Sequence, residues 1–261
     1  MSGIRPTGFL HLGNYFGAMR NYVKMQEEYE CFFMVADLHS LTTHPDTREL
    51  KQNVHRVLAE NIACGLNPDK AALYCQSHLY ETSELYLYLN MLAYKGELEK
   101  TTTFKDKVRQ HPQNVNAGLL TYPVLMATDI LIHRASYVPV GKDQEQHLEM
   151  TRNFAQRFNH RYGEVFPEPM AFNFGQTLLK VPSLDGTGKM SKSENQMATL
   201  YLSDDDDSIR KKVMKAKTGE APIEKNADMP EAIGNIFLLM ELVSEADVIA
   251  SYKHDFNECR I

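Results

Sequence analysis

The stretch Gly188-Lys189-Met190-Ser191-Lys192-Ser193 decides how the rest of this chain is interpreted. Its two lysines stand three positions apart, and Gly186 and Gly188 make the approach flexible. No hydrophobic run surrounds the stretch, so it predicts an exposed, mobile loop and not part of the core. Two ammonium groups on long side chains suit an anion that is bound briefly and released. A plain solvated basic loop is the competing interpretation of Lys-x-x-Lys spacing alone.

A second informative stretch is residues 2–15 near the start of the chain. Glycines and a proline predict a loop, and helical spacing of apolar residues begins at about Gly13. A glycine-rich loop that enters a helix can bind phosphate, because backbone N–H groups and the positive helix end attract an anion. His11 and Asn14 stand three apart at this entry, so both can face one oxygen cluster. In the competing interpretation, Asn14 only caps the helix.

Short apolar runs alternate with amphipathic segments along the first half of the chain. Residues 31–36 and 71–76 indicate buried parallel strands, and residues 47–65 and 83–94 indicate helices. This alternation predicts an α/β fold with a Rossmann-like doubly wound parallel sheet. His39 follows the first of these strands, at the sheet edge where ligands bind in such folds.

Residues 118–132 predict a helix that is apolar on nearly all sides and is therefore buried. Tyr122, Met126 and Asp129 share one face of it. A carboxylate in such a setting is costly unless it is paired. An aromatic ring, a thioether and one acceptor on a single face can bind a flat ring with one N–H group. Alternatively, an arginine such as Arg134 neutralises Asp129.

Residues 137–149 read as a strand, a glycine turn and a helix, which is again a nucleotide-binding junction. Gly141 permits close approach of a ligand to the backbone. Asp143 is expected to accept hydrogen bonds from ribose hydroxyls, and Val138 and Val140 to line the ring pocket.

These motifs together resemble one known family. Lys-Met-Ser-Lys-Ser is identical to the signature loop of class I aminoacyl-tRNA synthetases, and His-Leu-Gly-Asn at 11–14 resembles their His-Ile-Gly-His motif, with Asn14 in the last place. The wider strings at 2–18, 118–132 and 140–147 resemble the tryptophanyl-tRNA synthetases, and the resemblance covers essentially all 261 residues. It implies activation of L-tryptophan with ATP to tryptophanyl-adenylate plus pyrophosphate, then transfer to tRNA(Trp).

The resemblance also assigns site residues. The catalytic residues that it implies are His11, Asn14, Lys189 and Lys192. The ATP-binding residues that it implies are Arg5, Thr7, Gly13, Asn14, Lys105, Gly141, Asp143, Lys189, Met190, Ser191 and Lys192. The tryptophan-binding residues that it implies are Gly3, His39, Tyr122, Met126, Asp129, Val138, Val140 and Gln144. Mg²⁺ is expected on the ATP phosphates, with no metal site built from side chains.

The remaining expectations concern organisation and setting. Residues 1–178 are expected to form the catalytic domain, with a connecting insertion near 95–116, and residues 179–261 the lysine loop and the start of a helical region. The acidic run at 204–207 is expected to cap a helix rather than bind a metal, and residues 233–252 to form one amphipathic helix. A net charge of −6 gives no overall basic field, so tRNA contacts need a local patch.

We expect a cytoplasmic, soluble protein without membrane segments, since no apolar run approaches about 18 residues and the four scattered cysteines indicate a reduced compartment. The family implies a homodimer. The chain reads as trimmed at both ends, so we expect it to activate tryptophan but to charge tRNA poorly.

Three other functions compete with this one. A tyrosyl-tRNA synthetase shares the fold, but it would need partners for a phenol hydroxyl. A small adenylyltransferase would not need residues 189–193. A non-catalytic relative would not need both lysines together with His11 and Asn14.

Overall fold

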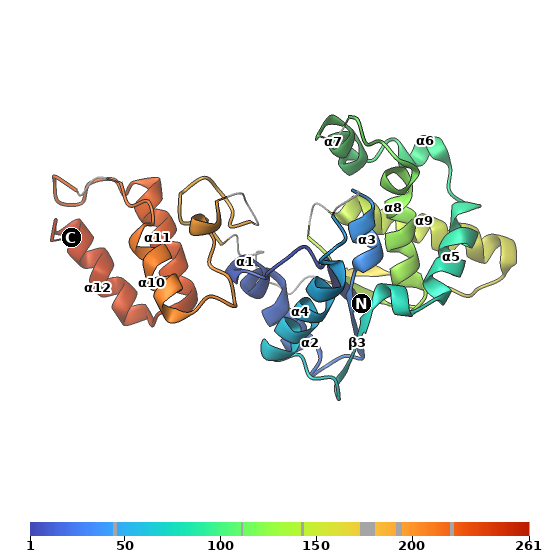
Figure 1. Cartoon of the computed structure of the whole chain (residues 1–261), viewed down its shortest axis with the longest axis horizontal. Coiled ribbons are helices and arrows are strands. Elements are labelled where there is room, and N and C mark those ends of the chain that lie inside the picture. Colours follow the sequence, from blue (N-terminus) through green and yellow to red (C-terminus); the bar gives the residue numbers. More distant parts are fainter. Residues whose placement is uncertain are drawn as a thin grey trace. The chain divides into compact units, whose positions relative to one another are not determined.

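The computed structural model describes residues 1–43, 46–110, 112–141, 144–172, 181–191, 195–219 and 222–260. The chain forms two compact units (Figure 1). The first comprises Met1–Gly8 and Lys24–Gln176, and the second comprises Phe9–Val23 and Thr177–Ile261. A short N-terminal segment, which the sequence placed in the catalytic domain, thus packs with the C-terminal part of the chain.

A parallel sheet is the centre of the first unit. Its strands β1 (Ser2–Ile4), β2 (Cys31–Val35) and β3 (Ala71–Cys75) lie in the order β1-β2-β3, and every pair is parallel. A second parallel pair joins β4 (Tyr137–Pro139) to β5 (Met170–Phe172). Helices connect the parallel strands, which confirms the predicted α/β class with its parallel sheet.

Helices of the first unit supply most of its core. They are α3 (Asp37–Leu41), α4 (Leu50–Ala63), the 3₁₀ turn η2 (Gln76–His78), α5 (Glu81–Asn90), α6 (Lys95–Leu98), α7 (Thr102–Gln110), α8 (Ala117–Leu131) and α9 (Glu145–Tyr162). Leu89 of α5, Val124 and Leu131 of α8 and Phe154 of α9 are fully buried in one apolar cluster. The prediction of a buried helix over 118–132 is confirmed by α8. Residues 95–116, expected to be a polar connection, contain α6 and α7.

The second unit begins with a helical stretch that changes its winding. It runs through α1 (Leu12–Asn14), a π-helical turn η1 (Tyr15–Met19) and α2 (Arg20–Met25). Backbone hydrogen bonds attach this segment to residues far along the chain. Leu12 donates to Leu200 at 3.0 Å, and Leu202 donates to Leu10 at 2.9 Å.

The approach to the lysine loop corrects one expectation. Met190 is only 1% exposed and packs in an apolar cluster with Phe16, Val181, Leu184 and Leu200. Its N–H donates to the carbonyl oxygen of Val181 at 2.7 Å. The prediction that no part of this stretch belongs to the core is therefore wrong. The apolar side chain of Met190 packs into the core although its neighbours in sequence are polar.

The rest of the second unit is helical. After the 3₁₀ turn η4 (Gln196–Ala198) come α10 (Asp206–Met214), α11 (Glu231–Val243) and α12 (Ala246–Asn257). The side chain of Asp205 accepts from the N–H of Ser208 and caps α10, as predicted for the acidic run. The single helix expected over 233–252 is wrong, since extended backbone at Ser244 and Glu245 divides it.

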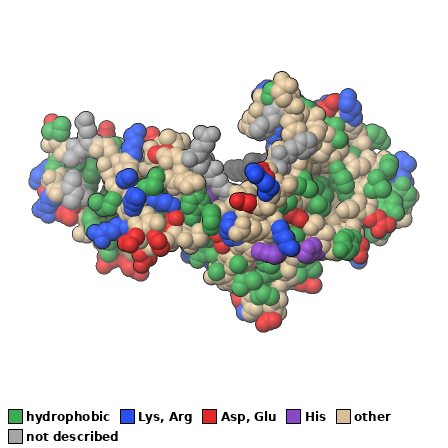
Figure 2. Space-filling view, in the orientation of Figure 1, with side chains coloured by type: hydrophobic (Ala, Val, Ile, Leu, Met, Phe, Trp, Pro, Cys, Tyr) green, Lys and Arg blue, Asp and Glu red, His purple; other side chains and the backbone are tan. Residues whose placement is uncertain are grey.

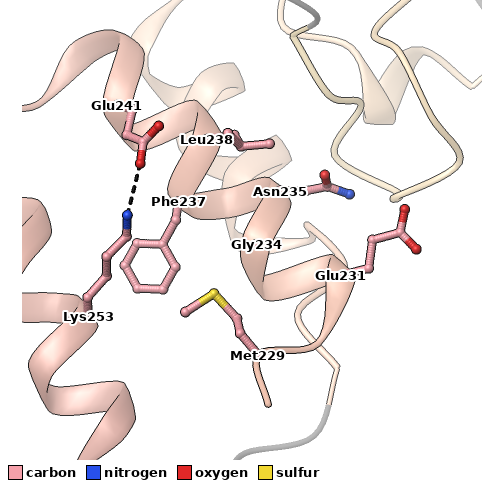
Figure 3. Close-up of a pocket in the computed structure, with 8 residues that line it drawn as sticks. All are labelled: Met229, Glu231, Gly234, Asn235, Phe237, Leu238, Glu241 and Lys253. Carbon is pink, nitrogen blue, oxygen red and sulfur yellow. Dashed lines mark hydrogen bonds and ion pairs between the residues drawn. The ribbon is translucent and has the colours of Figure 1, made fainter. Parts of the chain in front are cut away.

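A pocket of about 360 Å³ lies beside α11 and α12 (Figure 3). Phe237 and Leu238 give it apolar walls, and Glu241 and Lys253 form an ion pair of 2.9 Å at one side. In the part of the chain that the structure describes, no helix is both long and apolar enough to cross a bilayer.

Candidate active site

Among the acids of the first unit that the structure describes, Asp129 is the most deeply buried, with 2% of its surface exposed. Its Oδ2 lies 2.8 Å from Nε2 of His39, and its Oδ1 accepts from Nε2 of Gln76 at 2.7 Å. Among the residues that the structure describes, Asp129 therefore has His39 and Gln76 as polar partners, and Arg134, the alternative raised from the sequence, is not one of them. Because both carboxylate oxygens have a hydrogen-bonding partner, the free-energy cost of burying this acid is reduced.

The sheet explains why these partners meet. β2 and β3 are adjacent and parallel, with Val35 opposite Cys75, so the residues that follow both strands emerge at one edge. His39 comes from the helix after β2, and Gln76 directly follows β3. The backbone N–H of His39 also donates to Oε1 of Gln76 at 3.3 Å. The sequence singled out His39 by this position but missed Gln76, although the same signal was available for it.

Burial and hydrogen bonding act on Asp129 in opposite directions. Burial raises the pKa of the Asp129 carboxyl, whereas the hydrogen bonds and charge of His39 and the hydrogen bond from Gln76 lower it. Burial is the larger effect. A carboxylate can accept about four hydrogen bonds, so two protein donors leave capacity for an N–H group of a ligand. Such a donor would favour the ionised form further.

Tyr122, about two helical turns before Asp129 on α8, belongs to a second polar chain. Its hydroxyl lies 2.6 Å from Nε2 of His147, whose Nδ1 lies 3.0 Å from Oε1 of Gln144. Because an amide oxygen only accepts, His147 donates through Nδ1, and its Nε2 accepts from the tyrosine hydroxyl. Fully buried His147 therefore positions Gln144, the residue expected to contact the amino-acid substrate.

Lys107 of α7 lies over the same tyrosine. Its Nζ is 4.4 Å from the centre of the Tyr122 ring, and burial, with Arg5 as the second cause, lowers the pKa of the Lys107 ammonium. Two cations close enough to affect each other form a local positive region in an acidic chain. Lys105, which the resemblance assigned to the ATP phosphates, lies on the same helix and is exposed, and its role stays a prediction.

The remaining ring-pocket candidates fall into one apolar cluster. Val138 is buried, and Met126 and Val140 are half-buried beside it, together with Met34 of β2. Gly3 on β1 lies against the same methionine, since a β-carbon there would be 2.6 Å from Cγ of Met34. Met34 is thus a further candidate for the ring pocket, which its place in an apolar run concealed in the sequence.

The two signature segments meet within the second unit. His11 is 5% exposed, and its N–H donates to Oδ1 of Asn14 at 3.1 Å, which confirms the capping role considered for Asn14. A β-carbon at Gly13 would lie 2.9 Å from the His11 ring and 3.4 Å from the Met190 carbonyl oxygen. Oγ1 of Thr199 donates to the carbonyl oxygen of Ser191 at 2.8 Å and fixes the backbone there.

The other predicted site residues are placed as follows. Arg5 and Thr7 follow β1 and are exposed, Gly141 follows β4 and is half-buried, and Lys189 and Ser191 are exposed. Asp143 and Lys192 lie outside the described residues.

Comparison with known proteins agrees with this geometry. The family model for class I tRNA synthetases (W and Y) matches residues 1–260, so the chain belongs to that family. Within it, the chain is 57% identical to the tryptophan–tRNA ligase of Porphyromonas gingivalis, over all of this chain and 80% of the relative. It is 45% identical to the tryptophan–tRNA ligase of Caldanaerobacter subterraneus subsp. tengcongensis, over 95% of this chain and 76% of the relative.

A solved structure is similarly close. The crystal structure of tryptophanyl-tRNA synthetase from Campylobacter jejuni complexed with ADP and tryptophan superposes with a TM-score of 0.85 and is 34% identical. The similarity covers 99% of this chain and 83% of that one.

Proposed function

We propose that this chain is a tryptophan–tRNA ligase, which joins L-tryptophan to ATP as tryptophanyl-adenylate, releases pyrophosphate, and transfers the amino acid to tRNA(Trp). The observation that carries the proposal is the buried Asp129 carboxylate, held by His39 and Gln76 on the helix face that also bears Tyr122 and Met126. The names of the relatives and the tryptophan bound in the Campylobacter jejuni structure support it.

Asp129 favours tryptophan over tyrosine on chemical grounds. The indole nitrogen is a donor only, and a carboxylate is an acceptor only, so the two match without a further partner. A phenol hydroxyl both donates and accepts, and it would need a donor as well. A polar group left unpaired in a buried site costs about 1–3 kcal/mol. We therefore assign Asp129 as the acceptor of the indole N–H, with Met126 and Val138 as apolar walls.

The first chemical step needs no general base, because the tryptophan carboxylate is already ionised at neutral pH. It needs alignment of the reacting groups and positive charge as pyrophosphate departs. We assign the phosphates of ATP to His11, Asn14, Lys189 and Lys192. The contact of Gly13 with Met190, which brings the segments that carry these residues together, supports this assignment.

We propose that Mg²⁺ enters with ATP and is held mainly by phosphate oxygens, as is usual for this ion. The ion would neutralise charge on the phosphates, while binding and orientation fall to the side chains above.

We also propose a homodimer that buries the outer face of α5. Tyr80, Leu87, Tyr88 and Met91 are 54% to 81% exposed on that face, while Leu89 on the opposite side lies in the core. Figure 2 shows hydrophobic side chains gathered at the right, where Figure 1 places α5. An apolar helix face can pair with its own copy about a twofold axis, the commonest oligomer symmetry.

Sedimentation velocity of the Met91→Glu variant tests the dimer. We expect a monomer, because the charge would have to be buried at the proposed contact. Ile223→Glu, at a 90% exposed residue of the second unit, is the control and should sediment as the parent does. A parent that is monomeric at micromolar concentration would contradict the proposal.

Pyrophosphate exchange into ATP tests the ligase. Exchange should depend on tryptophan, and tyrosine should give little at the same concentration. Exchange with tyrosine alone would indicate the tyrosyl activity instead, and exchange with neither amino acid would contradict both assignments.

A further inference from the structure

Asp185, in the turn that precedes the lysine loop, accepts hydrogen bonds from three different residues. Oδ1 accepts from the hydroxyl of Ser183, from the N–H of Thr187 at 3.1 Å and from its hydroxyl at 2.7 Å. Oδ2 accepts from Nδ2 of Asn195 at 3.2 Å. These donors, Ser183 first and Thr187 next, hold the pKa of the Asp185 carboxyl well below its usual range. The group is thus a firmly ionised acceptor at neutral pH.

The donors lie on both sides of the signature segment. Ser183 and Thr187 precede Lys189, whereas Asn195 follows the last residue of the Lys-Met-Ser-Lys-Ser word. Asn195 is itself anchored, because its Oδ1 accepts from the N–H of Met197 at 3.2 Å and caps η4. A single carboxylate therefore connects the entry of the segment to its exit.

Backbone hydrogen bonds also hold the residues on either side of the segment. On the entry side, Ser183 donates to Gly188 at 2.9 Å. The entry is joined to η4 where Leu184 donates to Ala198 at 2.9 Å. The hydrogen bond from Asn195 to Asp185 adds a side-chain link between the entry turn and a residue just past the end of the segment. Asp185 is not part of any phosphate-binding assignment above, so these contacts call for a different role.

We propose that Asp185 is a positioning residue for the lysine loop, which acts by holding Asn195 and so sets the separation between the two ends of the segment. This role rests on the proposed function, because it concerns the lysines that we assign to the ATP phosphates. A lysine aligned with departing pyrophosphate lowers the activation barrier, so a loop with a loosened exit should lose kcat. The tryptophan ring, whose proposed contacts lie in the first unit, should be bound as before.

An exchange of the two polar partners tests this link directly. Asp185→Asn sets one amide NH₂ against another, and Asn195→Asp sets one carboxylate against another, so each single variant loses the bond. The double variant Asp185→Asn with Asn195→Asp restores it, with the donor now at position 185. An aspartate at position 195 can still accept from Met197 and cap η4. Asp205→Asn, at the cap of α10 in the same unit, is the control.

The measurements are kcat and KM for tryptophan in pyrophosphate exchange, with thermal unfolding to check folding. We expect each single variant to lower kcat about tenfold, the loss that one charge-assisted hydrogen bond can cause. KM for tryptophan should stay within about twofold, and the double variant should regain most of the loss. A merely structural role would lower the unfolding temperature without this selective recovery of kcat.

The outcomes distinguish the role of Asp185 from the ligase activity itself. Single variants with parental kcat, or a double variant as slow as the singles, would overturn the role of Asp185 and leave the ligase assignment in place. A parent enzyme without tryptophan-dependent exchange would overturn the proposed function and this role with it.

Discussion

Gly13 of the first signature segment lies beside the carbonyl oxygen of Met190 in the second. A β-carbon added to Gly13 would be only 3.4 Å from that oxygen. The same β-carbon would lie 2.9 Å from the ring of His11. Real β-carbons essentially never come within 3.0 Å of a neighbouring heavy atom, so His11 would have to move if Gly13 carried a side chain.

Gly13→Ala should therefore reduce kcat in pyrophosphate exchange at least tenfold, since a displacement of about 1 Å can cost far more than that in rate. Gly17→Ala is a matched control in the same helical stretch, because no atom lies within 4 Å of its added β-carbon. That variant should keep its activity and gain up to about 1 kcal/mol of stability. Equal activity of the two variants would contradict the proposed role of the contact.

Asp129→Asn should raise KM for tryptophan about tenfold, because a charge-assisted hydrogen bond is roughly twice as strong as a neutral one. An amide can still accept, so binding should weaken and not vanish. Discrimination against tyrosine should decrease as well. Asp69→Asn, an exposed acid of the same unit, is the control. An unchanged KM would mean that Asp129 serves only to pair His39 and Gln76.

Lys192→Ala should slow adenylate formation about a hundredfold or more, with little change in tryptophan binding. The reason is that its charge is needed most when the leaving pyrophosphate becomes more negative, and such interactions affect kcat more than KM. Lys211→Ala removes an exposed lysine of α10 and should behave as the parent. The measurement is single-turnover adenylate formation at saturating ATP, where a parental rate would exclude Lys192 from the chemistry.

His133 should make stability depend on pH. Its ring stacks on Phe32 at 4.3 Å, and its Nε2 lies 2.7 Å from the hydroxyl of Tyr74. Burial lowers the pKa of His133 from 6.5 to about 4. The unfolded chain therefore binds a proton between pH 6.5 and 4 that the folded chain does not, so this contribution to stability is complete above pH 6.5 and is lost as the pH falls to about 4.

Because the His133 ring is only half-buried, solvent screening reduces the effect to roughly 1–2 kcal/mol. Urea unfolding at pH 7, 5.5 and 4.5 measures it as a difference between the parent and His133→Gln. The variant should show a flatter pH dependence over this window, and His55→Gln, at an exposed histidine, should follow the parent. Parallel curves for all three proteins would contradict the assignment.

The candidate site was predictable where one element contains the whole signal. Tyr122, Met126 and Asp129 share a face of α8 because helical spacing places them there. Their partners were not predictable in the same way, since Gln76 and His147 come from other elements and reach the site only through the folding of the sheet and α9. The sequence around a glutamine after a strand, or around a histidine inside a helix, does not indicate which buried group that side chain will contact.

Two errors of the sequence analysis have physical causes. Met190 was taken as part of a solvent-exposed loop because its neighbours in sequence are polar, but the apolar groups that cover it, such as Phe16 and Leu200, come from distant segments. The division between α11 and α12 was missed because apolar residues keep helical spacing on both sides of it. Only the extended backbone at Ser244 marks the break.

The placement of residues 9–23 in the second unit also affects the order in which the protein can be built on the ribosome. The backbones of Leu10 and Leu12 form hydrogen bonds with Leu202 and Leu200. These two partners are synthesised only after nearly the whole first unit. At roughly 5–20 residues per second, this delay is on the order of ten to forty seconds. The first unit can complete its own sheet meanwhile, whereas the segment with His11 must wait, with its apolar side chains available to a chaperone.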